Sequence, residues 1–381
     1  MKKTLAVLFA LCLVLSTVLL PSSAKTEENT LSLTAKSAIL MEASTGKILY
    51  AHNETASLPP ASVTKVMTLL LAMEAVEAGK AAFTDTVTVS ERAAAMGGSQ
   101  IFLEAGETMS FSDMIKSVVI ASANDAAVAL AEHIAGSEEA FVDLMNRRAL
   151  ALGMVSTHFE NTNGLDDSVE NHVTSAKDIA IMSRELIKHP KILEYSTTWM
   201  DTVRDGSFTL TNTNRLVRFY PGATGLKTGS TAKAGFCISA TAERKGVSLI
   251  AVIMGAESRD VRNAEAKKLL DYGFASYGVY KDEERDLSPL AVRGGTSDRV
   301  SLSAAPFSCA LPKEKLSSVE KRISLPTHVT ASVASGEKLG EIAYYLDGEK
   351  IGTVDILAAE SIDRITFGEI LKRLFYAFTL G

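Results

Sequence analysis

The chain has 381 residues, of which 46% are hydrophobic and 22% are charged, and its formal net charge is −6. This length favours two domains, and the composition favours packed cores over disorder. An acidic chain without a basic cluster argues against nucleic acid as a partner.

The first residues predict an export signal. A basic start, Met1-Lys2-Lys3, precedes the apolar run 5–20, and Ser22-Ser23-Ala24 offers small residues for cleavage. This run is short for a membrane span, which needs roughly 20 apolar residues, so a removed signal is favoured over an uncleaved anchor. The mature protein would then begin near Lys25, outside the cytoplasm.

Cleavage would leave two of the three cysteines. Cys12 would be lost, and Cys237 and Cys309 would remain, one in each proposed domain. An oxidising compartment permits a disulfide. Free thiols are nevertheless favoured, because Cys237 lies in an apolar run where a small buried thiol packs well.

The chain continues with a strand pattern and then a helix pattern. Residues 37–42 and 47–50 predict two strands joined by a turn. Pro59-Pro60 breaks the chain, and the apolar body of residues 66–76 predicts a helix that ends at Gly79.

The middle of the chain is predicted to be helical. Apolar residues recur at helical spacing in four segments: 111–121, 124–134, 139–152 and 175–188. Ser122-Ala123-Asn124 falls in the junction between the first two, and a turn-rich loop covers residues 159–166.

After Lys227-Thr228-Gly229 the pattern changes to strands. Residues 234–242 and 247–254 predict two strands joined by a turn, and residues 262–274 predict a closing helix. Helices flanked by strands at both ends of the sequence imply one α/β unit whose sheet takes strands from both ends.

Beyond about residue 280 the pattern favours a small β-rich domain. The charged run 281–286 suits a linker or a solvated turn. Strands are predicted over residues 329–333, 341–346 and 350–357, with Asp347-Gly348 as the hairpin turn before the last of them.

Residues 362–380 predict an amphipathic helix. Its apolar face is formed by Phe367, Ile370, Leu371, Leu374 and Phe378. Its charged face is formed by Glu369, Lys372 and Arg373. Insertion in a membrane interface is favoured over packing on the β-rich domain or a partner subunit. The predicted organisation is therefore a signal (1–24), a catalytic domain (25–280), a β-rich domain (281–360) and a membrane-association helix (361–381).

Three short motifs carry the chemistry: Ser62-Val63-Thr64-Lys65, Ser122-Ala123-Asn124 and Lys227-Thr228-Gly229. Ser-x-x-Lys also occurs elsewhere, but only Ser62 stands at the start of an apolar helix, with Lys65 one turn on and on the same face. The other two patterns occur once each. Alternatively, the three motifs could be a helix cap, a turn and a strand edge without function. This alternative does not explain why all three motifs occur in this order.

The residue types fit acyl transfer through a serine ester. Lys65 can take the proton of Ser62 if burial and a second cation, Lys227, lower its pKa. Ser122 can relay a proton to a leaving amine, since a hydroxyl both donates and accepts. Gly229 is expected to let a substrate backbone approach the strand closely.

These motifs and their surroundings resemble the serine-type D-alanyl-D-alanine carboxypeptidases, the low-molecular-mass penicillin-binding proteins. The likeness covers nearly the whole chain and lies in Pro60-Ala61-Ser62-Val63-Thr64-Lys65, Ser122-Ala123-Asn124-Asp125-Ala126, Gly164-Leu165-Asp166, Gly225-Leu226-Lys227-Thr228-Gly229 and Lys233-Ala234-Gly235. The signal, β-rich domain and terminal helix are similar to membrane-attached members, above all the sporulation-associated type of endospore formers. The resemblance implies an α/β fold of the β-lactamase and penicillin-binding-protein kind, with an antiparallel sheet and a helical subdomain. It also implies peptidoglycan stem peptides as substrates, β-lactams as inhibitors and no cofactor.

The resemblance further implies the roles of the reacting groups. Ser62 would be the acylated nucleophile and Lys65 its general base. Ser122 and Lys227 would pass a proton to the departing D-alanine.

Substrate binding is implied in the same way. Asn124 would hold the substrate amide, and the backbone N–H groups of Ser230 and of the nucleophile would form the oxyanion hole. Thr228 and Arg262 would hold the terminal carboxylate, with Arg259 as the alternative arginine. Some relatives have His where this chain has Ser230.

Three other functions remain open at this stage. A class A β-lactamase would add a glutamate that activates water, and Glu160 lies in a loop between predicted helices. A DD-endopeptidase acting on cross-links would use the same catalytic residues, and a non-catalytic cell-wall scaffold would use none. The six histidines are scattered without ligand spacing, so the sequence indicates no metal site.

Overall fold

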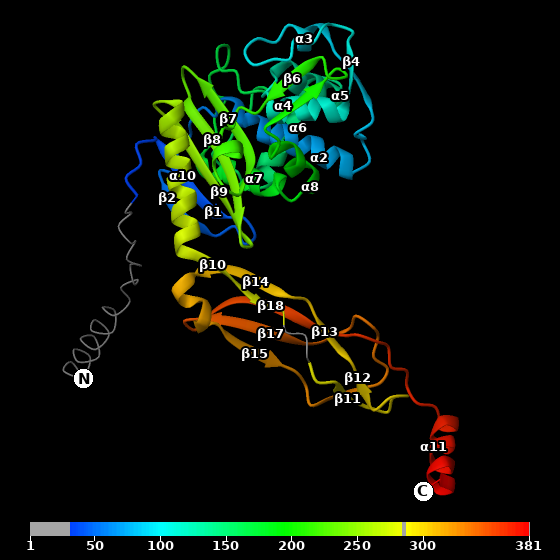
Figure 1. Ribbon diagram of the computed structural model, residues 1–381. Helices are drawn as coiled ribbons and strands as arrows, with labels where there is room; N and C mark the ends of the chain where they lie inside the picture. Colours follow the sequence, from blue (N-terminus) through cyan, green and yellow to red (C-terminus); the bar gives the residue numbers. More distant parts are fainter. Residues whose placement is uncertain (1–30, 284–286, 381) are drawn as a thin grey trace, which may run out of the picture. The chain divides into compact units, whose positions relative to one another are not determined.

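The computed structural model describes residues 31–283 and 287–380 (Figure 1). The predicted signal and Cys12 lie outside these described residues. Among them, the predicted catalytic region (34–276) and the β-rich region (277–366) each have their own sheets and hydrophobic core.

The catalytic region is built on a five-stranded antiparallel sheet with the order β2-β1-β9-β8-β7. Its strands are β1 (Ser37–Glu42), β2 (Ile48–His52), β7 (Ala223–Thr231), β8 (Gly235–Arg244) and β9 (Val247–Ala256). Strand β1 pairs with β9 along its whole length, from Ser37 opposite Met254 to Glu42 opposite Leu249. The predicted sheet with strands from both ends of the sequence is confirmed.

Helices cover both faces of this sheet (Figure 1). Helix α10 (Arg259–Ser276) packs on β8 and β9, and α7 (Ala176–Leu186) packs on β1 and β9 from the other side. At Gly273 the α10 backbone lies so close to the sheet that an added Cβ would be 2.6 Å from Leu249 Cδ1. Absence of a side chain at this position therefore sets the helix–sheet distance.

The remaining helices form the helical subdomain. They are η1 (Ala61–Thr64), α2 (Lys65–Glu77), α3 (Glu91–Ala94), α4 (Phe111–Ile120), α5 (Asn124–Ala135), α6 (Glu138–Ala151), α8 (Pro190–Ser196) and α9 (Leu216–Phe219). Two small hairpins accompany them: β3 (Thr86–Thr88) with β4 (Thr108–Ser110), and β5 (Met200–Val203) with β6 (Phe208–Thr211). Helices α2 and α5 are buried on nearly all sides, as expected for helices at the centre of a core.

Serine caps explain where helices α4, α6 and α7 start. The hydroxyls of Ser110, Ser137 and Ser175 accept hydrogen bonds from the backbone N–H groups three residues further on. Because Ser137 is the cap, α6 begins at Glu138, one residue earlier than predicted.

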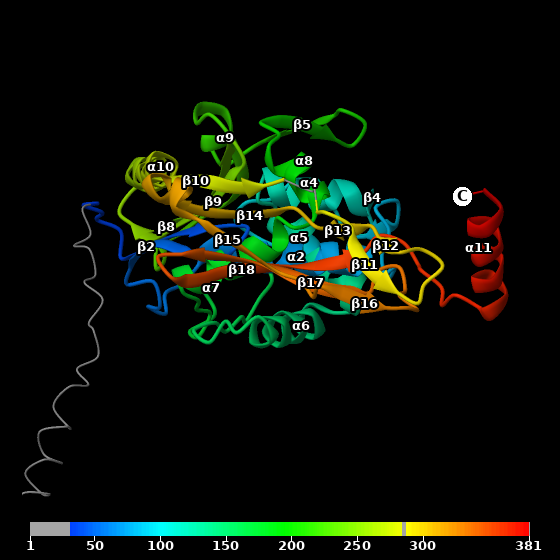
Figure 2. The same cartoon turned by 90° about the horizontal axis from the view of Figure 1, so that it is seen from below.

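The β-rich region contains three small sheets, with the orders β13-β18-β17-β15, β12-β11-β16 and β10-β14. The strands are β10 (Tyr277–Asp282), β11 (Leu290–Arg293), β12 (Arg299–Val300), β13 (Leu302–Ala304), β14 (Phe307–Pro312), β15 (Glu320–Ser324), β16 (His328–Thr330), β17 (Lys338–Leu346) and β18 (Glu349–Ala358), with η2 (Lys313–Ser318) after β14. Figure 2 shows the long hairpin of β17 and β18. Its turn is at Asp347-Gly348, as predicted, and both residues have the positive φ angles of a type I′ turn, 51° and 85°.

Two boundaries in this region differ from the sequence prediction. Lys281 and Asp282, expected in a linker or turn, belong to strand β10, where they pair with Ser308 and Phe307. The terminal helix α11 (Phe367–Leu380) starts later than residue 362, because Ile362 is buried and forms a β-bridge with Val333.

Two further properties of the described chain concern its cysteines and the lengths of its helices. Cys237 and Cys309 are both free and buried, which confirms the prediction of free thiols. In the part of the chain that the structure describes, every helix is too short or too polar to cross a bilayer.

Candidate active site

Ser62 lies on η1, directly ahead of the long buried helix α2. The prediction that it stands at a helix N-terminus is confirmed. Ala61, just before it, has a φ of +49°, a conformation that non-glycine residues rarely adopt. Such backbone geometry persists only where the surroundings enforce it, and it occurs often at functional sites.

Lys65 is fully buried, and its Nζ has three oxygen neighbours. It lies 3.0 Å from Ser62 Oγ, 2.5 Å from Asn124 Oδ1 and 2.8 Å from the carbonyl oxygen of Asn163. A neutral amine has two N–H groups and one lone pair. The amide and carbonyl oxygens are acceptors only, so they take the two N–H groups and leave the lone pair for the Ser62 hydroxyl.

The charge state of Lys65 follows from its surroundings. Burial and the nearby cation of Lys227 lower the pKa of Lys65 well below its ordinary value, while Asp125 opposes them. The pair of lysines that the sequence predicted to face each other is thus electrostatically coupled. A neutral Lys65 beside Ser62 is the arrangement that general-base catalysis requires.

Lys227 is fully buried in strand β7, and its ammonium donates to the carbonyl oxygen of Thr228 at 2.9 Å. Burial and the positive charge of Arg262 lower the pKa of Lys227 to about 7. This lysine therefore changes charge near neutral pH.

A cleft of about 620 Å³ opens beside Ser62. It brings together six residues that the sequence predicted for the site: Ser62, Ser122, Thr228, Gly229, Ser230 and Arg262. Arg259, the alternative arginine, lines it as well, but Arg259 is exposed and Arg262 is buried. The Arg262 guanidinium donates to Asn263 Oδ1 at 2.9 Å and lies beside the cleft wall.

Ser122 occupies the junction between α4 and α5 with a φ of +62°. This turn directs the chain so that the residue lines the cleft with Ser62. Among the described residues its hydroxyl forms no hydrogen bond to Lys65 or Lys227, so the proton relay through Ser122 stays a prediction.

The model of the family described as D-alanyl-D-alanine carboxypeptidase matches residues 23–258, and that of penicillin-binding protein 5, C-terminal domain, matches residues 277–364. The chain belongs to the D-alanyl-D-alanine carboxypeptidase family. It is 42% identical over 346 residues to the D-alanyl-D-alanine carboxypeptidase DacF of Bacillus subtilis, covering 89% of this chain and 88% of that protein. The predicted family and fold class are confirmed.

Solved structures agree with this assignment. Penicillin-binding protein 5 from Haemophilus influenzae is 33% identical, with a TM-score of 0.73 over 88% of this chain and 99% of that one. Penicillin-binding protein D2 from Listeria monocytogenes, in its ampicillin-bound form, is 32% identical, with a TM-score of 0.59 over 64% of this chain and 99% of that one.

Asn124 contacts the lysine of this carboxypeptidase directly. Its Oδ1 accepts from Lys65, and its Nδ2 donates to the carbonyl oxygen of Gly97 at 2.7 Å. Both ends of the amide are therefore engaged by the protein. In this structure Asn124 orients the lysine, and because its Nδ2 carries a second N–H, the expected contact with the substrate amide stays a prediction.

The structure gives a reason for Gly229 that the sequence did not indicate. A Cβ at this position would lie 2.7 Å from the backbone nitrogen of Ser62 and 2.9 Å from that of Val63. The glycine thus lets the nucleophile approach strand β7. Gly229 also lines the cleft, so a close approach of substrate backbone to this strand stays a prediction.

The sequence did not identify several residues of the cleft. Trp199 and Phe219 line it with their rings edge to face at 6.1 Å, together with Ser99, Thr211, Asn212, Thr213 and Arg215. The carbonyl of Asn163, which binds Lys65, was also missed. A lone tryptophan in the chain was the one available signal, because a backbone carbonyl has no signature in sequence.

Glu160 does not join the site. Its Oε2 accepts from the backbone nitrogen of Asn171 at 2.9 Å, and no carboxylate is among the described residues that line the cleft. The glutamate that a class A β-lactamase would need beside Ser62 is therefore not provided by this loop.

Proposed function

We propose that this D-alanyl-D-alanine carboxypeptidase removes the terminal D-alanine from peptidoglycan pentapeptide stems through an ester on Ser62. The observation that carries the proposal is the contact of Lys65 Nζ with Ser62 Oγ at 3.0 Å, with two further acceptors for the amine and burial to keep it neutral. This is the geometry of a serine with its general base already in place.

Acylation follows from these contacts. Ser62 Oγ attacks the carbonyl carbon between the two D-alanines while its proton passes to Lys65. The backbone N–H groups of Ser62 and Ser230 are proposed to bind the oxyanion, a contribution of about 3 kcal/mol for one donor in comparable enzymes. As the C–N bond breaks, the leaving amine takes a proton by way of Ser122, with Lys227 nearby. Water then attacks the ester, and its proton returns through Lys65 to Ser62.

The substrate carboxylate is proposed to bind at the basic end of the cleft. Arg262 and Thr228 line it, and Lys227 lies next to Thr228 in β7. A carboxylate placed there leaves the preceding amide beside Ser62. A β-lactam has the same two features, a carboxylate and a reactive amide, so we expect it to acylate Ser62 as well.

The first test is the release of D-alanine from a pentapeptide that ends in D-Ala-D-Ala, with Ser62→Ala as the control. Release that disappears in the control, together with a covalent penicillin adduct on Ser62, supports the proposal. A cross-linked dimer of stem peptides is assayed in parallel, because a DD-endopeptidase would use the same residues. Cleavage of the dimer without release of D-alanine would replace the proposal by the endopeptidase, and inactivity on both substrates would favour a scaffold.

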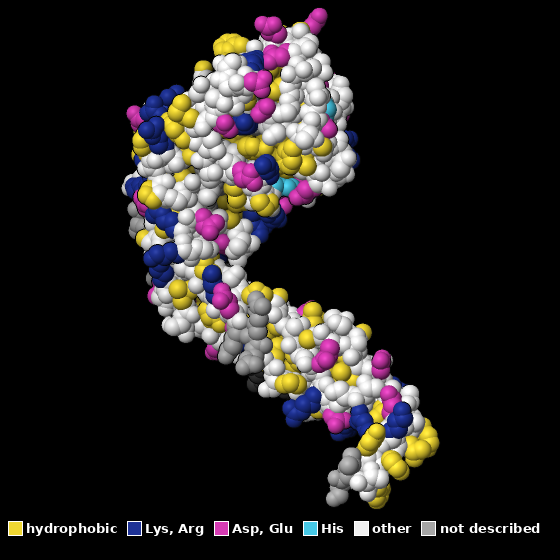
Figure 3. Space-filling view, turned by 45° about the vertical axis from the view of Figure 1, so that its right-hand side comes forward, with side chains coloured by type: hydrophobic (Ala, Val, Ile, Leu, Met, Phe, Trp, Pro, Cys, Tyr) yellow, Lys and Arg dark blue, Asp and Glu magenta, His cyan; other side chains and the backbone are white. Residues whose placement is uncertain are grey.

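We further propose that the exported protein works at the outer face of the cytoplasmic membrane and binds it through α11. The apolar side chains of this helix that the structure describes are exposed (Figure 3). Phe378 is 87% exposed. On its polar face Arg373 donates to the carbonyl of Thr296, which leaves the apolar face available. An exposed helix with aromatic residues on one face and basic residues on the other suits a membrane interface. A role in sporulation and in cell shape is proposed from the family resemblance alone.

A further inference from the structure

The loop of residues 161–165 supplies one of the acceptors of the proposed general base. The carbonyl oxygen of Asn163 accepts from Lys65 Nζ at 2.8 Å, and that of Thr162 accepts from Thr68 Oγ1 at 2.6 Å. Both partners belong to helix α2. The direction of the lysine amine therefore depends on how firmly this loop is held against α2.

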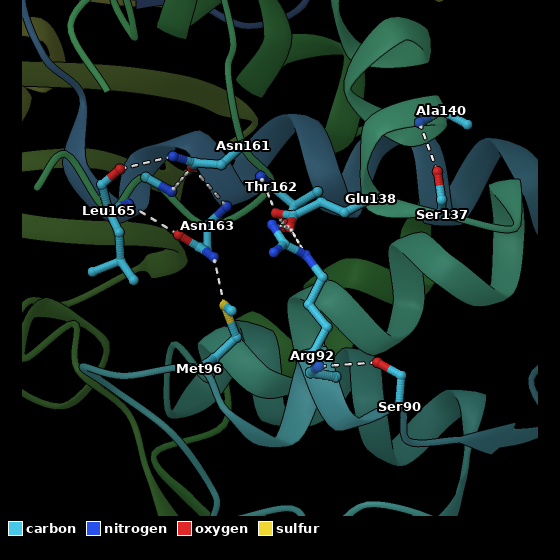
Figure 4. Close-up of polar contacts among 12 residues, drawn as sticks. Ser90, Arg92, Met96, Ser137, Glu138, Ala140, Asn161, Thr162, Asn163 and Leu165 are labelled. Carbon is cyan, nitrogen blue, oxygen red and sulfur yellow. Dashed lines mark hydrogen bonds and ion pairs between the residues drawn. The ribbon is translucent and has the colours of Figure 1, made fainter. Parts of the chain in front are cut away.

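The loop is shaped by its own side chains (Figure 4). Asn161 Oδ1 accepts from the backbone nitrogen of Gly164 at 2.7 Å, and Asn161 Nδ2 donates to the carbonyl oxygen of Leu165 at 2.7 Å. Asn163 Oδ1 accepts from the backbone nitrogen of Leu165 at 2.9 Å. These bonds fix the shape of the loop, while its position relative to the neighbouring helices needs an external contact.

Glu138, the first residue of α6, provides that contact. Its Oε1 accepts from both the backbone nitrogen and the hydroxyl of Thr162, at 3.2 and 2.9 Å. Its Oε2 accepts from Arg92 Nε at 2.8 Å and also from Arg92 Nη2. Figure 4 shows the carboxylate between the loop and the arginine. Because the Glu138 side chain is buried, leaving its charge unpaired would cost several kcal/mol.

Arg92 connects the same carboxylate to the second acceptor of the lysine. It lies on α3, and the chain that leaves α3 runs to Gly97, whose carbonyl oxygen accepts from Asn124 Nδ2 at 2.7 Å. Asn124 Oδ1 in turn accepts from Lys65. The loop that carries one acceptor of Lys65 is therefore joined to Glu138 directly, and the segment that orients the other acceptor is joined to it through Arg92.

We propose that Glu138 is a positioning residue for the proton transfer between Ser62 and Lys65. It touches no reacting atom and acts by holding the Asn163 carbonyl, and through Arg92 the segment that orients Asn124. The proposal rests on the proposed role of Lys65 as the base of Ser62. With both acceptors fixed, the lone pair of the neutral amine is directed at the hydroxyl. Without Glu138 the loop keeps its contacts with Thr68 and Met96 but loses its contact with α6, so the amine can turn away.

The test compares Glu138→Ala, Glu138→Gln and a matched control, Arg148→Ala. Arg148 lies near the other end of α6 and forms an ion pair with Glu74 of α2 at 2.7 Å, so its loss also breaks an α6 ion pair but leaves the site untouched. For each variant we would measure kcat and KM for D-alanine release, the rate of penicillin acylation, and Tm. Glu138→Ala should lower kcat and acylation about 10- to 100-fold, the range expected for a misplaced catalytic group, with a much smaller change in KM. Glu138→Gln should recover most of the loss, because its amide oxygen can still accept from Thr162, and Arg148→Ala should keep the wild-type kcat.

The pH profile separates positioning from a simple loss of stability. Burial is the main cause of the low pKa of Lys65, with Lys227 and Asp125 as the charged groups around it. A loosened loop admits water, which raises this pKa, so the acidic limb of the acylation rate should move to higher pH in Glu138→Ala and stay in place in Arg148→Ala.

Two outcomes would overturn the proposal. One is a folded Glu138→Ala variant with the wild-type kcat and pH profile, and the other is an equal loss of kcat in Arg148→Ala. If Glu138→Ala does not fold, the double variant Arg92→Met/Glu138→Gln decides the question, because it removes the half-exposed arginine without leaving a buried carboxylate unpaired. A kcat below that of Glu138→Gln supports the proposal, and an equal kcat refutes it. Failure of the proposed function itself is recognised beforehand, as an absence of acylation at Ser62 in the wild-type protein.

Discussion

His172 Nε2 lies 2.7 Å from the hydroxyl of Thr64, and this buried contact supports the segment that carries Ser62. His172 Nδ1 accepts from the backbone nitrogen of Glu160 at 3.0 Å, so the ring proton of the neutral imidazole is on Nε2 and is donated to Thr64. The Thr64 hydroxyl then donates to the carbonyl oxygen of Ala61 at 2.8 Å. This series of hydrogen bonds ends on the residue whose positive φ precedes the nucleophile.

The protonation of His172 should make the protein sensitive to acid. Burial, with a smaller effect of His158, lowers the pKa of His172 to about 4 from its ordinary 6.5. The unfolded chain takes up the proton at higher pH than the folded one, so the stabilisation is complete above pH 6.5. It should be lost as the pH falls towards 4, by about 1.4 kcal/mol per pH unit.

Urea unfolding at a series of pH values between 7 and 4.5 measures this dependence. His172→Asn should reduce the change of the free energy of unfolding with pH in this range. His52→Asn, a substitution on strand β2, should leave this pH dependence unchanged. Equal slopes in wild type and His172→Asn would show that other groups cause the acid sensitivity.

A side chain at position 229 should separate the nucleophile from strand β7. The added Cβ would meet backbone atoms of η1 at 2.7 and 2.9 Å, and backbone cannot move aside as a flexible side chain can. We expect Gly229→Ala to lose stability by about 1–3 kcal/mol and to slow penicillin acylation by about 100-fold. Thermal unfolding and labelling with a fluorescent penicillin measure the two effects. Gly368→Ala, where an added Cβ meets nothing within 4 Å, is the control, and normal acylation of Gly229→Ala would contradict the argument.

Arg262 should control the alkaline limb of the pH–rate profile. It is one of the two causes that lower the pKa of Lys227 to about 7, the larger being burial. Removing the guanidinium in Arg262→Ala raises the pKa of Lys227 towards its ordinary 10.5, so Lys227 stays charged to higher pH. The fall of kcat/KM above pH 7, which reports the free enzyme, should therefore move to higher pH. The exposed Arg259 serves as comparison, and a limb that does not move in Arg262→Ala would exclude Lys227 as the ionising group.

The apolar face of α11 should be required for membrane binding but not for catalysis. Leu371 and Leu374 are both exposed on this helix. The double substitution Leu371→Gln and Leu374→Gln should greatly reduce co-sedimentation with anionic vesicles, because buried apolar area is the main source of interfacial affinity. D-alanine release from a soluble peptide should stay at the wild-type rate. Unchanged sedimentation would instead favour a protein partner for this face.

A sheet with strands from both ends of the sequence and most of the helices could be predicted, because hydrophobic spacing is a local signal. Boundaries that depend on distant contacts could not. Ile362 continues the apolar pattern of the last helix, yet it is drawn into the core of the β-rich region opposite Val333. Lys281 and Asp282 have the composition of a linker, and only their pairing with β14 makes them a strand.

In the site, too, local sequence signals could be predicted and distant contacts could not. The spacing of the motifs indicates that Ser62, Lys65, Ser122 and Lys227 act together, and three of them lie at or beside the cleft with Lys65 behind Ser62. The pattern does not tell how they pair, so the contact between Asn124 and Lys65 was not predicted. Groups that act through backbone atoms, such as the Asn163 carbonyl, leave no trace in side-chain identity.

The charges that line the cleft also affect how fast a substrate is captured. Arg215, Arg259 and Arg262 face it, and among its described lining residues no anionic side chain opposes them. A cleft with walls of low dielectric focuses such a field outward, so a peptide with a free carboxylate end is attracted before contact. The chain as a whole has a formal net charge of −6 and repels polyanions. We therefore expect faster capture of peptides with a free carboxylate end than of amidated peptides, and rising ionic strength should reduce this difference.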